Sequence, residues 1–272
     1  MKKFKRKWKI ILVAFLGLVC IFLIVVGGVK KMSTSGSDFK LAILADDGVA
    51  LVSISPERKM INVLKLGDEA RLWIPGGLGW YRNAVIKGLL KQEKKMNEVE
   101  EIFFYNFGFK PDKVLIVSKI NDWKAKYWLR FSLNANKMLI KEEVINGDIN
   151  TQENLLDEVM VRDFSETNLV KEDLKLSIFN LTNINGLANF MARRFEWLGF
   201  SVVSTESLVE TKIDSCLVKY GDEVDKSLGW KTINKVINCK QEYDKNLNNG
   251  EIELYFDDKF SSMIKYPSYN NI

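Results

Sequence analysis

Histidine is absent from the 272-residue chain, and only three cysteines and four prolines occur in it. Without histidine, Ser-His-Asp triads, histidine general bases and histidine metal ligands are excluded. The scarcity of proline, with glycines scattered rather than clustered, argues against a long disordered linker. Any catalysis would have to use carboxylates, lysine, arginine, tyrosine, serine or cysteine. The length allows one large domain or two small ones.

The chain after residue 31 also lacks an excess of basic residues. Residues 1–31 hold eight lysines and arginines and no acidic residue. The other 32 basic residues face 35 acidic ones, so the rest of the chain carries a net charge of −3. Nucleic-acid-binding domains usually carry a strong positive excess. We therefore expect no nucleic-acid partner.

One long uncharged run is present, from Ile10 to Val29, and six basic residues precede it. Twenty helical residues span about 30 Å, the thickness of a bilayer core. The positive-inside rule keeps residues 1–9 in the cytosol and exports the rest. The competing interpretation is a cleaved signal peptide, but its apolar region is usually about 7–15 residues long and no A-x-A-like site follows. We predict a single transmembrane anchor at 10–29 in the cell membrane, with the C-terminal part extracytoplasmic.

The cysteines outside this run, Cys216 and Cys239, form an even pair, which favours a disulfide in an exported domain. Both lie in short apolar runs, "CLV" and "VINC", that are typical of strands. Adjacent strands can bring two Cα atoms within the roughly 4.4–6.8 Å that a disulfide needs. Two buried thiols are the alternative. Two cysteines without histidine are too few for a structural zinc site, so we expect no metal there.

Hydrophobic patterning predicts a β-meander at the start of the exported part, with strands at 40–45, 48–55 and 60–66. The segment "WIPGGLGW" at 73–80 is expected to be a loop, because proline and three glycines break regular structure. Helices at 83–92 and 98–107 and a strand at 113–120 are expected to follow. Together these elements indicate a layered α/β domain over residues 38–170.

The pattern is cleaner from residue 174 onward. A strand at 174–181 leads into a helix that ends near Leu198, with Gly199 as the glycine that follows its C-cap. The further elements expected are strands at 200–204, 213–220, 235–239 and 251–256 and a helix at 223–234. The order β-α-β-β-α-β-β is typical of a compact split βαβ module. We predict a small α+β domain over residues 174–262.

The stretch "NLTNINGLANFMARRFEWLGFSVVS" at 180–204 resembles the C-terminal domain of LytR-type envelope proteins. That domain typically opens with a strand, an N-G-T-x-x-x-G-L-A turn into a helix, and then L-x-x-x-G-F-x-V. The matching residues here are Asn180, Thr182, Gly186, Leu187, Ala188, Leu198, Gly199, Phe200 and Val202. Leu181 stands where the family usually has glycine.

The first half resembles the catalytic core of the LytR-CpsA-Psr (LCP) family. The segment "DDGVALVSISPERKMINVLKL" at 46–66 is similar to the start of that core, with Asp47 at its acidic position and Pro56 at its turn. The segment "VEEIFFYNFGFKPDKVLIVSKIND" at 99–122 is similar to a later helix and strand of the core. The order of anchor, core and C-terminal domain also suits the family.

The resemblance implies a chemistry that this chain departs from. Family enzymes move a glycopolymer from a polyprenyl pyrophosphate lipid to the cell wall, with arginines neutralising the pyrophosphate and an acidic residue serving a metal or a base. Where the family has P-R-D-T, this chain has Gly67-Asp68-Glu69-Ala70, so the arginine is missing. A second arginine cluster is missing as well. Pyrophosphate held without paired arginines is poorly compensated. The resemblance therefore implies a reduced, degenerate core, and no catalytic residue is assigned.

Three residues remain as candidate ligand contacts. Asp47 fits the family's acidic position, and Arg71 and Arg82 flank the glycine-rich segment, where they could bind an anionic head group. The alternatives are a turn for Asp47 and a solvated surface for the arginines. We expect a membrane-anchored cell-envelope protein that acts as a non-catalytic binding or scaffolding module without a cofactor. The partners expected are cell-wall glycopolymer, polyprenyl lipid or envelope proteins. A glycopolymer phosphotransferase that uses Mg²⁺ is the alternative.

Overall fold

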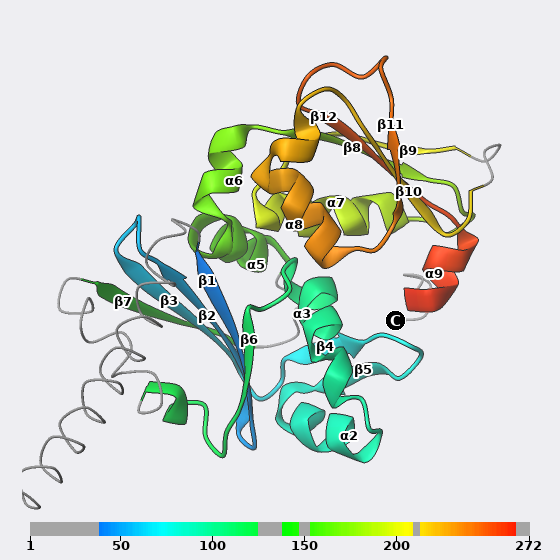
Figure 1. The fold of residues 1–272 in the computed structure, drawn as a ribbon. Coiled ribbons are helices and arrows are strands. Elements are labelled where there is room, and N and C mark those ends of the chain that lie inside the picture. The colour runs from blue at the N-terminus through cyan, green and yellow to red at the C-terminus, as the bar shows by residue number, and fades with distance from the viewer. Residues whose placement is uncertain (1–37, 125–137, 147–152, 209–212, 265–272) are drawn as a thin grey trace, which may run out of the picture.

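The computed structural model describes residues 38–124, 138–146, 153–208 and 213–264. These residues form a mixed α/β structure with two five-stranded sheets and helices between them (Figure 1). The predicted anchor at 10–29 lies outside the described residues. Within the described ranges, no helix is long and apolar enough to cross a bilayer.

The first sheet has the strand order β6-β1-β2-β3-β7. Its strands are β1 (Phe39–Ala45), β2 (Gly48–Ser55), β3 (Met60–Leu66), β6 (Lys113–Ile116) and β7 (Leu139–Ile145). The first three form the predicted meander, because tight turns at 46–47 and 56–59 join antiparallel neighbours. β6 adds in parallel to β1, and β7 adds in parallel to β3. Nearly every residue of β1 and β2 is buried, so both faces of the sheet are covered there.

The glycine-rich segment is a β-hairpin rather than the predicted loop. Strands β4 (Arg71–Ile74) and β5 (Gly79–Arg82) pair antiparallel, with Trp73 opposite Trp80. The turn between them holds Gly76 and Gly77 at positive φ, which costs glycine little. The same residues that break a long strand therefore close a tight turn.

Helices follow the hairpin and pack on the sheet. They are η1 (Asn83–Val85), α2 (Ile86–Gln92), η2 (Met96–Glu98) and α3 (Val99–Phe107). All but two residues of α3 are buried, and the side chain of Asn106 donates to the carbonyl of Trp73 at 2.8 Å. This contact fixes α3 against the hairpin.

The connection to the second sheet is helical. Its elements are α5 (Glu153–Val159), the π-helical turn η3 (Met160–Phe164) and α6 (Thr167–Glu172). Glu172, at the end of α6, accepts hydrogen bonds from the backbone N–H groups of Leu228 and Gly229 at 2.7 and 2.9 Å. A carboxylate is favourable at that position because the first N–H groups of a helix have no partner within the helix.

The second sheet has the order β11-β10-β12-β8-β9. Its strands are β8 (Lys175–Asn180), β9 (Ser201–Ser207), β10 (Cys216–Tyr220), β11 (Lys240–Tyr243) and β12 (Glu251–Phe256). The helices are α7 (Leu187–Leu198), η4 (Val224–Lys226), α8 (Leu228–Val236) and α9 (Asp258–Ile264). Gly199 ends α7 in the left-handed conformation, as the sequence predicts.

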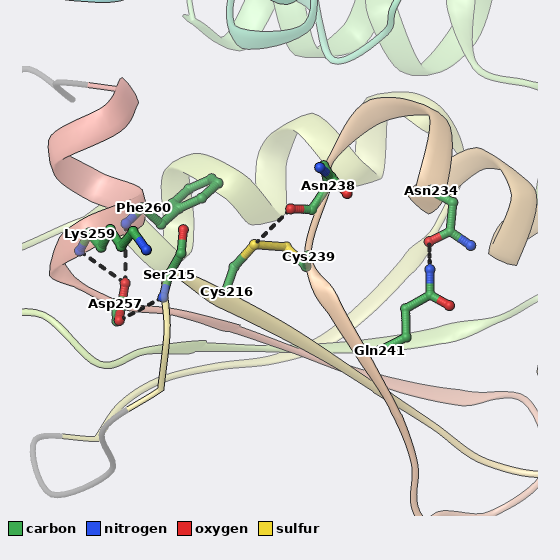
Figure 2. Close-up of a disulfide and its surroundings, with 9 residues drawn as sticks. All are labelled: Ser215, Cys216, Asn234, Asn238, Cys239, Gln241, Asp257, Lys259 and Phe260. Carbon is green, nitrogen blue, oxygen red and sulfur yellow. Dashed lines mark hydrogen bonds between the residues drawn. A yellow bond between two sulfur atoms is a disulfide. The ribbon is translucent and has the colours of Figure 1, made fainter.

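The predicted disulfide is present between Cys216 and Cys239, whose Cα atoms lie 4.9 Å apart (Figure 2). β10 and β11 run parallel with Leu217 opposite Lys240, so the two cysteines occupy the preceding register position. The predicted strand at 235–239 is wrong. Residues 235 and 236 remain in α8, and β11 begins only after Cys239.

One hydrophobic core joins the two sheets. We call the residues before and after the predicted boundary near residue 172 the two halves. Buried residues of both halves belong to the same cluster, and aromatic pairs cross between the halves. The rings of Trp73 and Phe190 lie 6.2 Å apart, and those of Phe104 and Phe195 lie 6.1 Å apart, both edge-on. Helices α3, α5, α7 and α8 occupy the space between the sheets (Figure 1). The domain boundary predicted near residue 172 remains a prediction.

Gly108 offers a direct test of this packing. It ends α3 at a φ of 78°, and an added Cβ would lie 2.6 Å from the carbonyl oxygen of Arg194 on α7. We expect Gly108→Ala to lower the free energy of unfolding by at least about 2 kcal/mol, because strain and a backbone clash combine. Chemical denaturation of the full chain measures the change.

Gly88 in α2 provides the matched control. An added Cβ there meets nothing within 4 Å. Gly88→Ala should leave stability unchanged or raise it by up to about 1 kcal/mol, because alanine favours a helix. A Gly108→Ala protein as stable as the wild type would contradict the close contact between α3 and α7.

Candidate functional site

Asp47 lies in the tight turn between β1 and β2. Its Oδ1 atom accepts the backbone N–H of Ile120 at 2.8 Å, so the side chain holds the segment that follows β6. The start of β2 is fixed as well, since Val49 donates its N–H to Asn83 Oδ1 at 2.6 Å. Asp47 thus has a turn-stabilising contact, and its predicted role toward a ligand remains a prediction.

Arg71 and Arg82 face each other across the β4–β5 hairpin as direct cross-strand partners. Both are exposed, and Arg82 Nη2 lies 3.5 Å from Glu69 Oε2 in an ion pair that is largely solvated. In the part of the chain that the structure describes, neither arginine makes an ion pair with Asp47. The structure therefore places the two arginines next to each other. The hydrogen bond that Asp47 accepts comes from Ile120 and not from either arginine.

Four other arginines bind within the protein. Arg58 and Arg162 connect the first sheet to η3, since Arg58 donates to the carbonyl of Arg162 and Arg162 pairs with Glu143 on β7, each at 2.7 Å. On α7, Arg193 pairs with Asp157 of α5, and Arg194 donates to the carbonyl of Tyr105 at 2.8 Å. These guanidinium groups hold elements together.

The C-terminal end of η3 is capped by side chains from the first sheet. A helix leaves its last carbonyls without partners, and cations are favourable there. Here four consecutive carbonyls, from Arg162 to Ser165, each accept a bond from a side chain of the first sheet or of the turn between β2 and β3. The donors are Arg58 to residues 162 and 165, Asn62 to residue 163 and Lys40 to residue 164. We call this set of contacts the η3 joint.

Lys40 is the buried cation of the joint. It extends from β1, is 5% exposed, and its ammonium lies 5.2 Å from the centre of the Phe109 ring. Burial lowers the pKa of Lys40, and the nearby carboxylates of Glu166, Asp38 and Asp112 act in the opposite direction. Burial also raises the pKa of Glu166. A charged lysine in this place depends on the carboxylates around it.

A cleft lies beside the joint, between β1 and the loop after α3 on one side and α8 on the other. Its volume is about 190 Å³. The lining residues are Asp38, Lys40, Phe109, Lys110, Asp112, Glu166, Leu198, Leu228, Lys231, Thr232, Lys235 and Val236. Five of them lie on α8 at spacings of three and four residues, so one face of that helix forms a wall.

Asp38 lines this cleft and carries a buried acceptor without a partner in the described part of the chain. Its Oδ2 atom accepts the N–H and the hydroxyl of Thr167 at 3.3 and 3.2 Å. Its Oδ1 atom is buried and has no hydrogen-bond partner among the described residues. A buried acceptor without a partner is unfavourable by about 1–3 kcal/mol.

One signal for this cleft is present in the sequence. Asp38 and Lys40 come just before the apolar run at 41–45, and charged residues are rarely buried without partners. Those partners, Phe164 and Glu166, lie more than a hundred residues further along the chain. Across the described ranges, no group of three or more acidic or cysteine side chains is arranged to hold a metal ion.

The similarity of this chain to known proteins is weak. No protein-family model matches the sequence, and a search of curated proteins finds no match. Among solved structures, the chain is similar to "LytR-CPS2A-psr family protein YwtF (TagT) with bound octaprenyl pyrophosphate lipid". The identity is 13%, the match covers 64% of this chain and 77% of the other, and the TM-score is 0.27. That TM-score does not establish a shared fold, so functional conclusions depend on the residues of this chain.

Proposed function

We propose that this protein is a single-pass, membrane-anchored cell-envelope protein whose folded part is a non-catalytic binding or scaffolding module outside the cytosol. The uncharged run at 10–29 behind a basic tail supports the anchor and the orientation. The disulfide between Cys216 and Cys239 supports an oxidising compartment.

The use of arginine is the observation that carries the non-catalytic proposal. Of the six arginines in the described ranges, four bind carbonyls or carboxylates within the fold. Arg58 and Arg162 connect the first sheet to η3, whereas Arg193 and Arg194 connect α7 to α5 and α3. A diphosphate needs paired guanidinium groups in a partly dry site. Arg71 and Arg82 are instead exposed on a hairpin, and neither lines the cleft beside the η3 joint. The arrangement supports a rigid unit with a binding cleft rather than turnover of a lipid diphosphate.

The alternative is a glycopolymer phosphotransferase, and one observation favours it. Arg71 and Arg82 are cross-strand partners, so two guanidinium groups are adjacent on β4 and β5. With Mg²⁺ such a pair could neutralise part of a pyrophosphate. Asp47 would be the candidate acidic residue.

Turnover of a polyprenyl pyrophosphate-linked saccharide separates the two functions. We expect the full-length protein in detergent to give no turnover with or without Mg²⁺, because the paired cations are solvated. Arg71→Ala, Arg82→Ala and the surface control Lys91→Ala should then behave alike. Mg²⁺-dependent turnover that Arg71→Ala abolishes and Lys91→Ala preserves would establish the transferase instead.

The topology has a separate test. A reporter that is active only outside the cytosol, fused after Ile272, should be active in cells. Activity of a matching cytosolic reporter at the same position would remove the envelope proposal, whatever the turnover assay shows.

A further inference from the structure

The cleft beside the η3 joint lies where the chain enters the fold. Asp38 comes directly before β1 and lines the cleft together with residues of α8 and of the loop after α3. Residues 30–37 separate Asp38 from the predicted anchor at 10–29. A connection of this length spans at most about 30 Å when it is fully extended. The proposed anchor therefore keeps the cleft within about 30 Å of the membrane surface.

The rim of the cleft carries lysines on both sides. Lys231 and Lys235 are exposed on α8, four residues apart, so they project from the same side of that helix. Lys110 lines the opposite wall, on the loop after α3 that faces α8 (Figure 1). In the ranges that the structure describes, Lys110 and Lys231 form no ion pair. We call these three lysines the basic rim.

The carboxylates that line the cleft do not balance the basic rim. Asp112 accepts the N–H of Lys40 at 2.8 Å and pairs with Lys235 at 2.7 Å. Asp38 and Glu166 are 6% and 9% exposed, and their charges act on the buried ammonium of Lys40. The other two lysines of the basic rim therefore have no carboxylate partner among the lining residues.

A basic rim so close to the anchor fits an anionic membrane surface. Lysines near a bilayer that contains anionic lipid are attracted to it, over a Debye length of about 8–10 Å. Lys30 and Lys31 directly follow the uncharged run and add two positive charges at the same surface. Because the anchor tethers the basic rim to one bilayer, that bilayer is the anionic surface present at the highest effective concentration.

We infer that the basic rim docks on anionic phospholipid head groups of the membrane that holds the anchor. This inference rests on the proposed anchor and goes beyond it, because it assigns a second membrane contact to the folded part. The anchor alone would let the folded part rotate about residues 30–37. Contact through α8 and the loop after α3 fixes the cleft toward the bilayer.

Acetylation of lysines by an amine-reactive reagent tests the inference on the full-length wild-type protein in nanodiscs, with mass spectrometry as the readout. One set of nanodiscs contains phosphatidylcholine alone, and the other contains phosphatidylglycerol as well. Labelling of Lys110 and Lys231 should be about fivefold slower in the anionic nanodiscs, because the head groups cover the ammonium groups. Lys91 lies on α2, where Lys87 pairs with Asp46 at the opposite end of β1, and should be labelled equally in both. Salt at about 1 M, where the Debye length is about 3 Å, should remove the difference.

A charge reversal locates the contact. Lys231→Glu changes an exposed residue of α8 and should remove most of the difference in Lys110 labelling between the two nanodiscs. The matched variant Lys91→Glu should leave that difference unchanged. Equal labelling of the basic rim in both nanodiscs, or protection of Lys110 that both variants leave intact, would overturn the inference. Either result would leave the proposed envelope module standing, whereas a protein that does not enter nanodiscs would remove the anchor and this inference with it.

Discussion

Replacing both Cys216 and Cys239 with serine is expected to lower the free energy of unfolding by about 3 kcal/mol under oxidising conditions. The bridge closes a loop with a sequence separation of 23 residues, and its removal restores conformational freedom to the unfolded chain. The loop contains α8, whose exposed face forms one wall of the cleft. Urea denaturation of the full chain without reductant measures the change.

Reductant supplies the control for the serine substitutions. Wild-type protein with reductant should unfold close to the double variant, and the variant itself should not respond to reductant. If the oxidised wild type and the variant unfold at the same urea concentration, the bridge contributes nothing and the expectation is wrong.

Lys40→Met is expected to lower the free energy of unfolding by about 3 kcal/mol near pH 8. Methionine fills a similar volume but leaves the carbonyl of Phe164 without its donor and the carboxylates of Asp38 and Glu166 without their cation. Removing one partner of a buried charge group is costly because the remaining charge is uncompensated. Denaturation curves at several pH values measure the effect.

The deficit should grow as the pH rises. Burial raises the pKa of Glu166 above its ordinary 4.5, and loss of Lys40 removes a contact that lowers it. The folded variant then binds a proton more tightly than the unfolded chain, so its stability is greatest at low pH and is lost as pH rises through the folded-state pKa. A deficit that is larger at pH 5 than at pH 8 would contradict this account.

Lys65→Met on β3 is the matched control. Lys65 pairs with Glu142 at 3.0 Å, and both side chains are partly solvated. Ion pairs of this kind contribute about 0–1 kcal/mol, so this variant should stay within about 1 kcal/mol of the wild type. An equal loss of unfolding free energy in both variants would mean that the effect of Lys40→Met is not specific to its buried position.

Local patterning was sufficient for much of the fold. The short run at 48–55 predicts β2, which is buried at every position, and Gly199 marks the end of α7. It failed at 73–80, where glycines close a hairpin turn rather than end regular structure. It also failed at 235–239, where α8 continues because Val236 is buried against the core.

The site was less accessible from sequence. The adjacency of Arg71 and Arg82 requires the hairpin, and a loop at 73–80, as the sequence predicts, does not imply it. Lys40 meets Phe164 and Glu166 only through tertiary packing, at separations that periodicity does not reach. The disulfide was predictable because the two cysteines outside the uncharged run at 10–29 allow one pairing.

The contacts of Asp38 determine how a pull on the N-terminal side would be distributed. Asp38 immediately precedes β1, yet its backbone bonds Glu166 and its carboxylate bonds Thr167 at the start of α6. Tension that arrives through the chain at Asp38 is therefore shared at once between the strand of the first sheet and the helix that leads to the second. A pulling force applied there would act on both halves at once and would not separate one half from the other.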